Sequence, residues 1–409
     1  MEVLFVENAP GFGGSLTGIL PLVEAFPDYI HPTLACPFDP REFVDVPRRL
    51  RIEVVSIDRG RINRRPTDSV PKALLRFAWF NVRPWMREVM RIGRKYNVDV
   101  IHANNLVLGN FGAALAAARL RCPILSHQKG YEHDGRLVRK IVRGRWYTHH
   151  IATSHSIAEH LLSLGVPPER CTMIYDAVVP PDQTPARRVD AARPVVAMHS
   201  VLRESKGQEV FLRAAARAMR SAGPFQAVVA GAPPERSDYP ERLRRLASEL
   251  GIADRVEFPG HVRDVYGFLA GVDVSVHASV EPEPFGRVVA ESMMMGVPVV
   301  AASGSGAAEY VESSGAGWTT PPGDVDSLAD ALVRLLAAPD VRRRLGEAGQ
   351  AYARREFAPR AIADQVVALY EDVVARRTPR VASGPARSNA AGRPTKVEGG
   401  RSALCRQSP

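Results

Sequence analysis

Hydrophobic residues along the chain follow two alternating patterns. Short runs rich in Val, Ile and Ala predict buried β-strands, and between them apolar residues recur every three or four positions, as in helices such as 16–26, 108–120 and 157–164. The strands are expected near 2–8, 31–37, 52–57, 98–104, 123–128, 149–154 and 171–176, and then near 195–200, 225–231, 256–259, 273–278, 297–302 and 316–320. Such alternation predicts an α/β protein whose parallel sheets are covered by helices on both faces.

Two series of strands indicate two doubly wound domains. Proline accumulates and periodicity lapses between Pro180 and Arg188, where a linker is expected. Beyond Asp324 the strand patterns end, and three helices are expected near 326–337, 340–356 and 359–376. The segment 378–409 contains few large apolar residues and is expected to be disordered.

Composition narrows the class of protein. Hydrophobic residues make up 45% of the chain and charged residues 24%, which is typical of a globular protein. No apolar run approaches the ~20 residues that span a bilayer. Glu2 and Glu7 make a signal peptide an unfavoured interpretation, and four scattered cysteines without a C-x-x-C pair favour a reduced chain. We therefore expect a cytoplasmic location.

The net charge of +10 is concentrated in two places. Residues 59–95 contain eleven Lys and Arg against two acids, and residues 378–409 contain six against one. This distribution indicates localised anionic partners rather than nucleic acid. Arginines alternate with Trp and Phe over 72–87, as suits an anionic membrane surface. The alternative is a helix packed on the N-terminal sheet and broken at Pro84, with its arginines simply solvated.

Glycines follow the first strand. In open parallel sheets, ligands bind at the carboxyl ends of the strands. Gly13 and Gly14, within Gly11–Ser15, precede a helix, where a glycine backbone and free N–H groups suit a phosphate. The motif is not a complete dinucleotide fingerprint, so a plain tight turn is the competing interpretation.

A stronger group of residues lies between 281 and 291. Glu283 follows a strand, Pro284 begins a helix, and the next three residues present first-turn N–H groups that suit a diphosphate or a sugar hydroxyl. Glu291 lies about two turns further, ~10 Å along the helix, where it can accept both hydroxyls of a ribose. The competing interpretation is a capping acid followed by a solvated glutamate.

These residues carry a family resemblance. Glu283 and Glu291, with seven residues between them and Gly-Val-Pro-Val-Val at 296–300, resemble the donor-site signature of family 4 retaining glycosyltransferases. That family has the GT-B fold, in which two Rossmann-like domains face each other across a cleft. Other segments resemble the family in the same order, namely Gly13-Gly14, 99–103, 174–178, Lys206-Gly207 and 304–309. The resemblance spans roughly residues 1–375 and is most specific from 195 to 360.

The resemblance implies a domain plan and roles for single residues. An acceptor-side domain 1–179 and a linker 180–193 would precede a nucleotide-sugar domain 194–357, a helix 358–377 returning toward the N-terminal domain, and the tail 378–409. Glu291 would bind the ribose, Lys206 would neutralise the leaving diphosphate, and His127 would contact the donor sugar. The remaining donor contacts would come from Gly13, Gly14, Glu283 and the backbone of Phe285, Gly286 and Arg287. Of these residues, His127, Lys206 and Glu283 would be catalytic.

Two positions depart from the family pattern. The arginine that usually precedes the Lys-Gly loop is missing, and Arg203 is the candidate replacement because its planar fork can bind a phosphate bidentately. The family's Asn-Gly pair is Asp176-Ala177 here, and the sequence gives this change no interpretation.

The resemblance implies transfer of a sugar, with retention, from a nucleotide diphosphate sugar to a hydroxyl of a sugar or lipid-linked acceptor, in polysaccharide, glycolipid or cell-envelope glycan synthesis. No catalytic pair of carboxylates is required, and because no D-x-D motif lies in a suitable loop, no metal or cofactor is expected. Two alternatives stay open: another GT-B enzyme, such as a nucleotide-sugar epimerase, and a catalytically silent module that binds a nucleotide-sugar or glycan. The nucleotide base, the sugar, the acceptor and the oligomeric state stay open as well.

Overall fold

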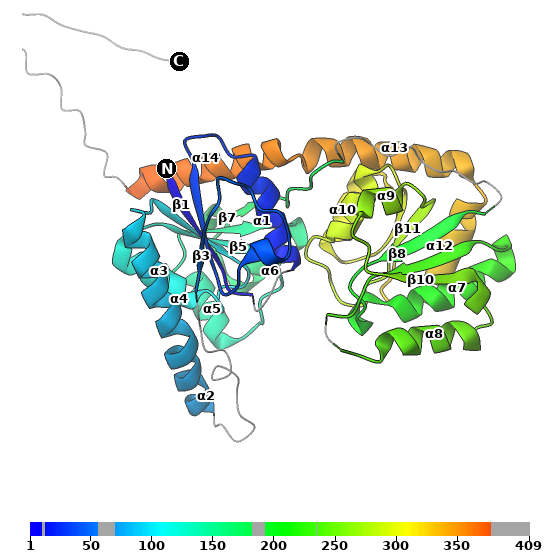
Figure 1. The fold of residues 1–409 in the computed structure, drawn as a ribbon, viewed down its shortest axis with the longest axis horizontal. Coiled ribbons are helices and arrows are strands. Elements are labelled where there is room, and N and C mark those ends of the chain that lie inside the picture. The colour runs from blue at the N-terminus through cyan, green and yellow to red at the C-terminus, as the bar shows by residue number, and fades with distance from the viewer. Residues whose placement is uncertain (10–12, 56–69, 182–192, 235, 378–409) are drawn as a thin grey trace, which may run out of the picture.

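The computed structural model describes residues 1–9, 13–55, 70–181, 193–234 and 236–377. The expected tail 378–409, most of the linker, Gly11 and the basic stretch 59–69 lie outside these residues. In Figure 1 the described chain forms two α/β units side by side along the long axis, each with a central sheet flanked by helices.

The first sheet has seven parallel strands in the order β3-β2-β1-β4-β5-β6-β7. Their bounds are β1 (Glu2–Glu7), β2 (His31–Cys36), β3 (Arg51–Val54), β4 (Val100–Asn104), β5 (Ile124–Gln128), β6 (His149–Ala152) and β7 (Cys171–Met173). The strand order reverses direction at β1, which lies between β2 and β4, and such a switch point opens a crevice at the carboxyl ends. The register places Asn104 level with both Glu7 on β1 and His127 on β5.

The second sheet has six parallel strands in the order β10-β9-β8-β11-β12-β13. Their bounds are β8 (Val195–His199), β9 (Gln226–Ala230), β10 (Val256–Gly260), β11 (Val274–His277), β12 (Val299–Ala302) and β13 (Gly317–Thr320). All thirteen expected strands are therefore present, within a few residues of their expected bounds. The switch point of this sheet lies between β8 and β11.

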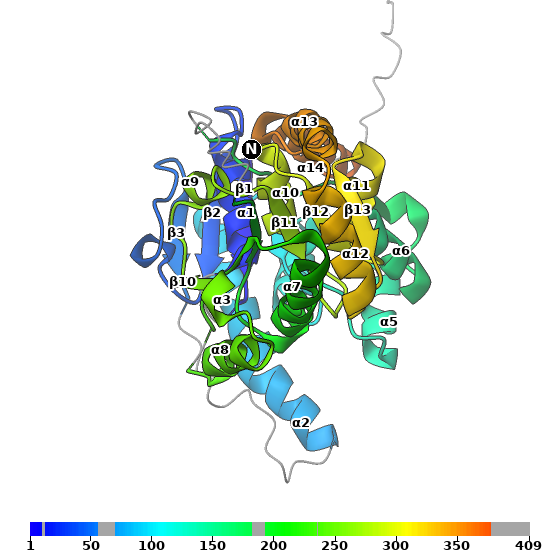
Figure 2. The ribbon, with the colours of Figure 1, turned by 90° about the vertical axis from the view of Figure 1, so that its right-hand side faces the viewer.

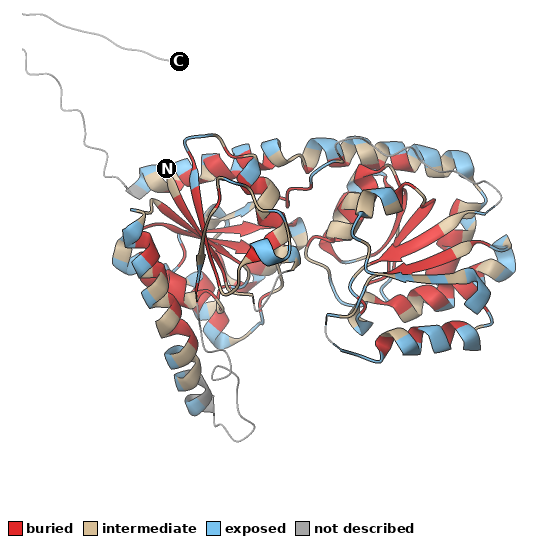
Figure 3. Ribbon diagram, viewed as in Figure 1, coloured by how far each residue is buried: buried red, intermediate tan, exposed pale blue. Residues whose placement is uncertain are grey.

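Helices connect successive strands and cover both sheets. Those of the first unit are α1 (Gly14–Glu24), α2 (Val70–Phe77), α3 (Arg83–Lys95), α4 (Phe111–Leu120), α5 (Arg136–Arg143) and α6 (His155–Leu164). Those that follow are α7 (Gln208–Ala222), α8 (Tyr239–Glu249), α9 (Val265–Leu269), α10 (Arg287–Met294), α11 (Gly306–Ser314), α12 (Val325–Leu336), α13 (Pro339–Glu356) and α14 (Pro359–Arg377). The strands are mostly buried, whereas the helices expose their outer faces (Figure 3), as expected for doubly wound sheets.

The last two helices link the two units. Helix α13 packs against α10, and α14 crosses to the first unit and packs against α1 (Figure 1). A continuous apolar cluster joins the units below them. Tyr175 contributes to it from the first unit, and its ring packs edge-on against Tyr310 and Phe357 of the second.

The structure of the helical segment 70–95 contradicts one part of its sequence interpretation, namely that the helix is broken at Pro84. The chain stays helical from α2 through a π-helical turn, Ala78–Val82, into α3, so it is not broken at Pro84. Pro84 lies in the first turn of α3, directly after the wider π turn, which accommodates the irregular hydrogen bonding. Trp85, Val89 and Ile92 are buried on α3, whereas α2 projects from the body on the side away from α13 and α14 (Figure 2).

Candidate active site

A cavity of about 250 Å³ lies between the carboxyl ends of the two sheets. The loop from Glu283 to Arg287 lines one side of it. Residues from the other unit line the opposite side: Gly14, Ser15, Asn105, Lys129, Thr153 and Asp176. The cavity thus brings Glu283, Gly14 and the start of α10 together, although they are far apart in sequence.

The start of α10 has a glycine-specific geometry. Gly286 has φ +74° and precedes the helix without a side-chain cap, so this end offers backbone N–H groups. A Cβ atom on Gly286 would lie 2.6 Å from the Cβ of Ala307. The Tyr310 hydroxyl lies 2.6 Å from the carbonyl oxygen of Phe285 and 2.8 Å from that of Gly286, which holds the loop in place.

Glu283 is an ionised carboxylate in this cavity. It forms an ion pair with Lys206, and its Oε2 lies 3.4 Å from the Ser279 hydroxyl and 3.6 Å from His277 Nε2. Burial alone would raise the pKa of Glu283, but the hydrogen bond from His277 and the charge of Lys206 lower it to about 2. The cavity at the start of α10 is therefore lined by an ionised carboxylate that is paired with a cation.

Glu291 lies in an adjoining cavity of about 200 Å³ at the carboxyl ends of β8 and β9, together with Ser200, Gly231, His261 and Val288 among others. Arg287 Nε donates to its Oε1 at 3.1 Å, and His199 Nε2 lies 3.7 Å from its Oε2. His199 is buried, and neither of its ring nitrogens has a hydrogen-bond partner among the described residues. Unpaired buried polar groups are costly, so His199 suits a polar ligand.

Arg203 lies elsewhere. It is exposed at the start of the short helical turn Glu204–Lys206 and lines a third cavity with Pro233, Tyr239 and Arg242. It does not line the cavity that holds Glu283. Its direction depends on the turn that follows β8, which a sequence pattern does not specify.

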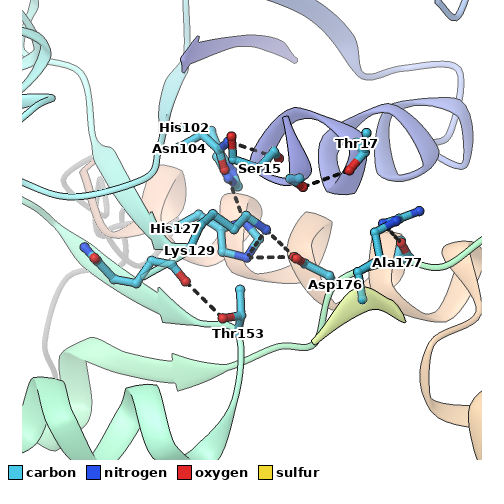
Figure 4. A network of polar contacts seen from close by, with 12 residues as sticks. Ser15, Thr17, His102, Asn104, His127, Lys129, Thr153, Asp176 and Ala177 are labelled. Carbon is cyan, nitrogen blue, oxygen red and sulfur yellow. Dashed lines mark hydrogen bonds and ion pairs between the residues drawn. The ribbon is translucent and has the colours of Figure 1, made fainter. Parts of the chain in front are cut away.

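His127 is buried on β5 and does not line the Glu283 cavity. Its Nδ1 lies 3.0 Å from His102 Nε2, and its Nε2 lies 3.0 Å from Lys129 Nζ. Burial, aided by the nearby charge of Lys129, lowers the pKa of His127 well below its ordinary value, so the ring is neutral. Figure 4 shows Lys129 next to His127 and pointing toward Asp176, with which it forms an ion pair.

Lys129 and Asp176 were not assigned to the site from sequence. Lys129 is the first residue after β5, which is the position where ligand contacts are expected in such a sheet, and this signal was available. Asp176 was noted only as a departure from the family pattern. Gly14 lines the cavity at the start of α1, whereas Gly13 precedes it in extended conformation.

The described residues offer neither a cluster of metal ligands nor a membrane-spanning helix. Among the residues that the structure describes, no group of three or more His, Cys, Asp and Glu could hold a metal ion. Within the same residues, no helix combines the length and the apolar character needed to cross a membrane.

Family models match nearly all of the two units. The model described as Glycosyltransferase Family 4 matches residues 12–180, and the one described as Glycosyl transferases group 1 matches residues 182–352.

Curated relatives match over shorter segments. The chain is 35% identical over 129 residues to the lipopolysaccharide core biosynthesis glycosyltransferase LpsE of Rhizobium meliloti, covering 32% of this chain and 38% of that protein. It is 33% identical over 253 residues to a D-inositol 3-phosphate glycosyltransferase of Acidothermus cellulolyticus, covering 55% and 54%. It is 30% identical over 215 residues to a GDP-mannose-dependent monoacylated phosphatidylinositol monomannoside mannosyltransferase of Corynebacterium glutamicum, covering 50% and 53%. The chain thus spans about half the length, or less, of these curated relatives.

Solved structures share the whole fold. Anabaena HepE in complex with UDP and glucose superposes with a TM-score of 0.73 at 24% identity, covering 91% of this chain and 100% of that one. WaaG, a glycosyltransferase involved in lipopolysaccharide biosynthesis, superposes with a TM-score of 0.62 at 16% identity, covering 89% and 99%. These likenesses establish the GT-B fold. The expectation raised by the Glu283–Glu291 signature is confirmed: the chain belongs to the family 4 glycosyltransferases.

Proposed function

We propose that this protein transfers a sugar, with retention at the anomeric carbon, from a nucleotide diphosphate sugar to a hydroxyl acceptor in cell-envelope glycan synthesis. The observation that carries the proposal is that Glu283 lines a cavity between the two sheets together with the uncapped start of α10, and that its carboxylate forms an ion pair with Lys206. We also propose the domain boundaries that the resemblance implies: an acceptor-side domain 1–179, a linker 180–193, a nucleotide-sugar domain 194–357, and a helix 358–377 that returns toward the first domain.

The donor would be held along α10. Glu291 accepts hydrogen bonds from the ribose, and the base lies in the adjoining cavity beside His199. Glu283 and the backbone of Phe285, Gly286 and Arg287 hold the hydroxyls of the donor sugar, and Gly14 approaches from the opposite unit. Because Lys206 is paired with Glu283, an incoming diphosphate takes over the cation and leaves the carboxylate to accept sugar hydroxyls.

The reaction breaks the bond between the anomeric carbon and the diphosphate oxygen and forms one to the acceptor oxygen. The acceptor proton passes to the leaving diphosphate, so no catalytic base from the protein is needed. Lys206 stabilises the negative charge on the departing oxygen, and the amides at the start of α10 add to the positive potential. With charge supplied in this way, we propose a mechanism that uses no metal.

The proposal about the acceptor rests on the names of the relatives and on the helix that projects from the first unit. LpsE is named for lipopolysaccharide core synthesis, and the Corynebacterium glutamicum relative acts on a phosphatidylinositol mannoside. On the helical segment that projects from the first unit, Leu75 is 70% exposed and Trp79 58% exposed, and the Arg83 guanidinium lies 4.1 Å above the Trp79 ring. Aromatic and basic side chains of this kind suit an anionic membrane surface. We therefore propose a cytoplasmic protein that contacts the inner face of the membrane here and uses a sugar or lipid-linked acceptor.

The silent module is the second candidate. It is favoured by the missing family arginine and by the position of Arg203 in a separate cavity. Such a module would bind a nucleotide sugar without turning it over.

A donor screen separates these functions. The full chain is incubated with UDP-, GDP- and dTDP-sugars, with and without a bacterial lipid extract, and release of nucleoside diphosphate is measured. We expect release that depends on the extract, a glycosylated product whose anomeric configuration by NMR matches the donor, and a loss of more than 100-fold for Lys206→Ala. Lys140→Ala, on the exposed side of α5, serves as the matched control and should be unchanged. Donor binding without release in any arm would support the silent module.

A further inference from the structure

Lys129 is a buried ammonium group, and its two polar neighbours use only two of its three N–H donors. Its side chain is only 5% exposed, yet it lines the Glu283 cavity. It donates to Asp176 Oδ1, and its Nζ lies 3.0 Å from His127 Nε2. An ammonium group has three N–H donors, so one is left for the cavity.

The hydrogen bonds behind Lys129 form an ordered chain. The ammonium can only donate, so Nε2 of His127 accepts and its Nδ1 carries the proton. That proton is donated to His102 Nε2 at 3.0 Å, and His102 Nδ1 in turn donates to the Tyr370 hydroxyl at 2.6 Å. All three side chains behind Lys129 are buried, and Tyr370 belongs to α14, which crosses from the other unit. Lys129 is therefore held in one orientation from behind.

Asp176 is held equally closely. Its side chain is 9% exposed and packs against α1 at Gly18, where a Cβ atom would lie 3.1 Å from Oδ2. The backbone beside it is tied to the second unit, because Arg287 Nη1 donates to the carbonyl oxygen of Ala177 at 3.3 Å. A fixed carboxylate and a fixed ammonium therefore lie side by side, across the cavity from Glu283.

We propose that Lys129 and Asp176 form the second half of the sugar site and determine which sugar is accepted. Each hydroxyl of a sugar both donates and accepts, so an adjacent cation and carboxylate complement a pair of neighbouring hydroxyls. His127 then acts as a positioning residue for Lys129. This inference rests on the proposed function, because it deepens the assignment of the same cavity.

The test compares a nucleotide sugar with its nucleotide. UDP-glucose, GDP-mannose, UDP and GDP are titrated into the full chain by calorimetry. For the nucleotide sugar that the wild type binds more tightly, Lys129→Met should weaken binding at least tenfold, while affinity for the parent nucleoside diphosphate stays within twofold. Lys129→Arg should recover part of the loss, and Lys140→Met should behave like the wild type.

Because Lys129→Met leaves Asp176 as an unpaired buried charge, thermal melting accompanies each titration. If that variant does not fold, the double variant Lys129→Met/Asp176→Asn, which carries no unpaired charge, decides the matter with the same expected tenfold loss. A folded variant whose affinity for the nucleotide sugar is within twofold of the wild type would overturn the inference alone. If the wild type binds none of the UDP-, GDP- and dTDP-sugars of the donor screen, the proposed function fails with it.

The positioning role of His127 has its own readout. His127→Phe should lower kcat and sugar affinity without changing affinity for the nucleoside diphosphate, and His127→Asn, whose amide oxygen can accept from Lys129, should restore part of both. Equal losses in the two variants would assign His127 to packing only.

Discussion

At the residue scale, the site consists of paired charges. Lys206 with Glu283, Arg287 with Glu291, and Lys129 with Asp176 each place a cation against a carboxylate. Removing one member of a buried pair leaves an uncompensated charge, which is more costly than removing both. Loss of function in a single variant must therefore be separated from loss of stability.

Gly286 should be intolerant of a side chain. An alanine there would adopt a positive φ and press its Cβ against Ala307, 2.6 Å away. We expect Gly286→Ala to lower the free energy of unfolding by about 2–3 kcal/mol and to raise the KM for the donor. Gly315, with φ +67°, is the matched control, because its would-be Cβ would meet no heavy atom within 4 Å among the described residues outside its local backbone. Gly315→Ala should cost only about 1 kcal/mol. Urea denaturation and donor kinetics measure both effects, and equal losses for the two variants would contradict this account of the loop.

Glu132 should make stability depend on pH. Burial, opposed by the hydrogen bond from the Val107 N–H and by Gln128, raises its pKa from 4.5 to about 7. Between these values the folded chain binds one proton more than the unfolded chain, so the free energy of unfolding falls as pH rises through this range. Glu132→Gln should remove about 2–3 kcal/mol of this fall. Guanidinium denaturation at pH 5 and pH 8 tests the prediction, which fails if wild type and variant lose the same free energy.

At the element scale, the strands were predictable and the side-chain directions were not. Each parallel strand is covered on both faces, so it appears in the sequence as a short apolar run with clear ends. Helix caps depend on residues that are close in sequence. For example, Asp324 accepts from the backbone N–H groups of Asp326 and Ser327 at the start of α12. The continuity of 70–95 was missed because a π turn, which relieves the irregularity near Pro84, has no simple sequence signal.

The projecting helix should govern membrane contact. We expect the double variant Leu75→Ala/Trp79→Ala to reduce binding to vesicles of 30% phosphatidylglycerol by at least fivefold, because both side chains are exposed beside arginines. Phe43→Ala, which removes another exposed aromatic ring of the same unit, should leave binding unchanged. Vesicle co-sedimentation measures this, and unaltered binding of the double variant would remove the helix from the membrane account.

At the scale of the whole molecule, the two units are held together by contacts that no local sequence pattern reveals. Glu309 on α11 accepts from the backbone N–H groups of His155 and Ser156, at 2.9 and 3.1 Å, at the start of α6 in the other unit. The sequence placed Glu309 in a family turn but could not show its partners, which lie more than 150 positions away. The two-unit plan followed from the repeated strand series, whereas the line of contact between the units depends on tertiary packing.

Loosening this contact should admit water. Glu309→Ala removes the acceptor that joins α11 to α6, so we expect donor hydrolysis to rise at least threefold relative to transfer. Glu312→Ala, on the same helix but bonded to Thr319 within its own unit, is the control and should keep the wild-type ratio. Release of nucleoside diphosphate with and without acceptor gives this ratio, and the same ratio in both variants would dissociate Glu309 from closure.

The central claim is that Glu283, which precedes α10, and Glu291, which lies within it, hold an activated sugar between the units. A crystal structure of the full chain with the best donor of the screen tests it most directly. The account predicts the ribose hydroxyls within hydrogen-bond distance of Glu291, the diphosphate beside Lys206, and the sugar between Glu283 and Lys129. Donor density in the cavity of Arg203 and Arg242 instead, or in neither of the two cavities along α10, would contradict it.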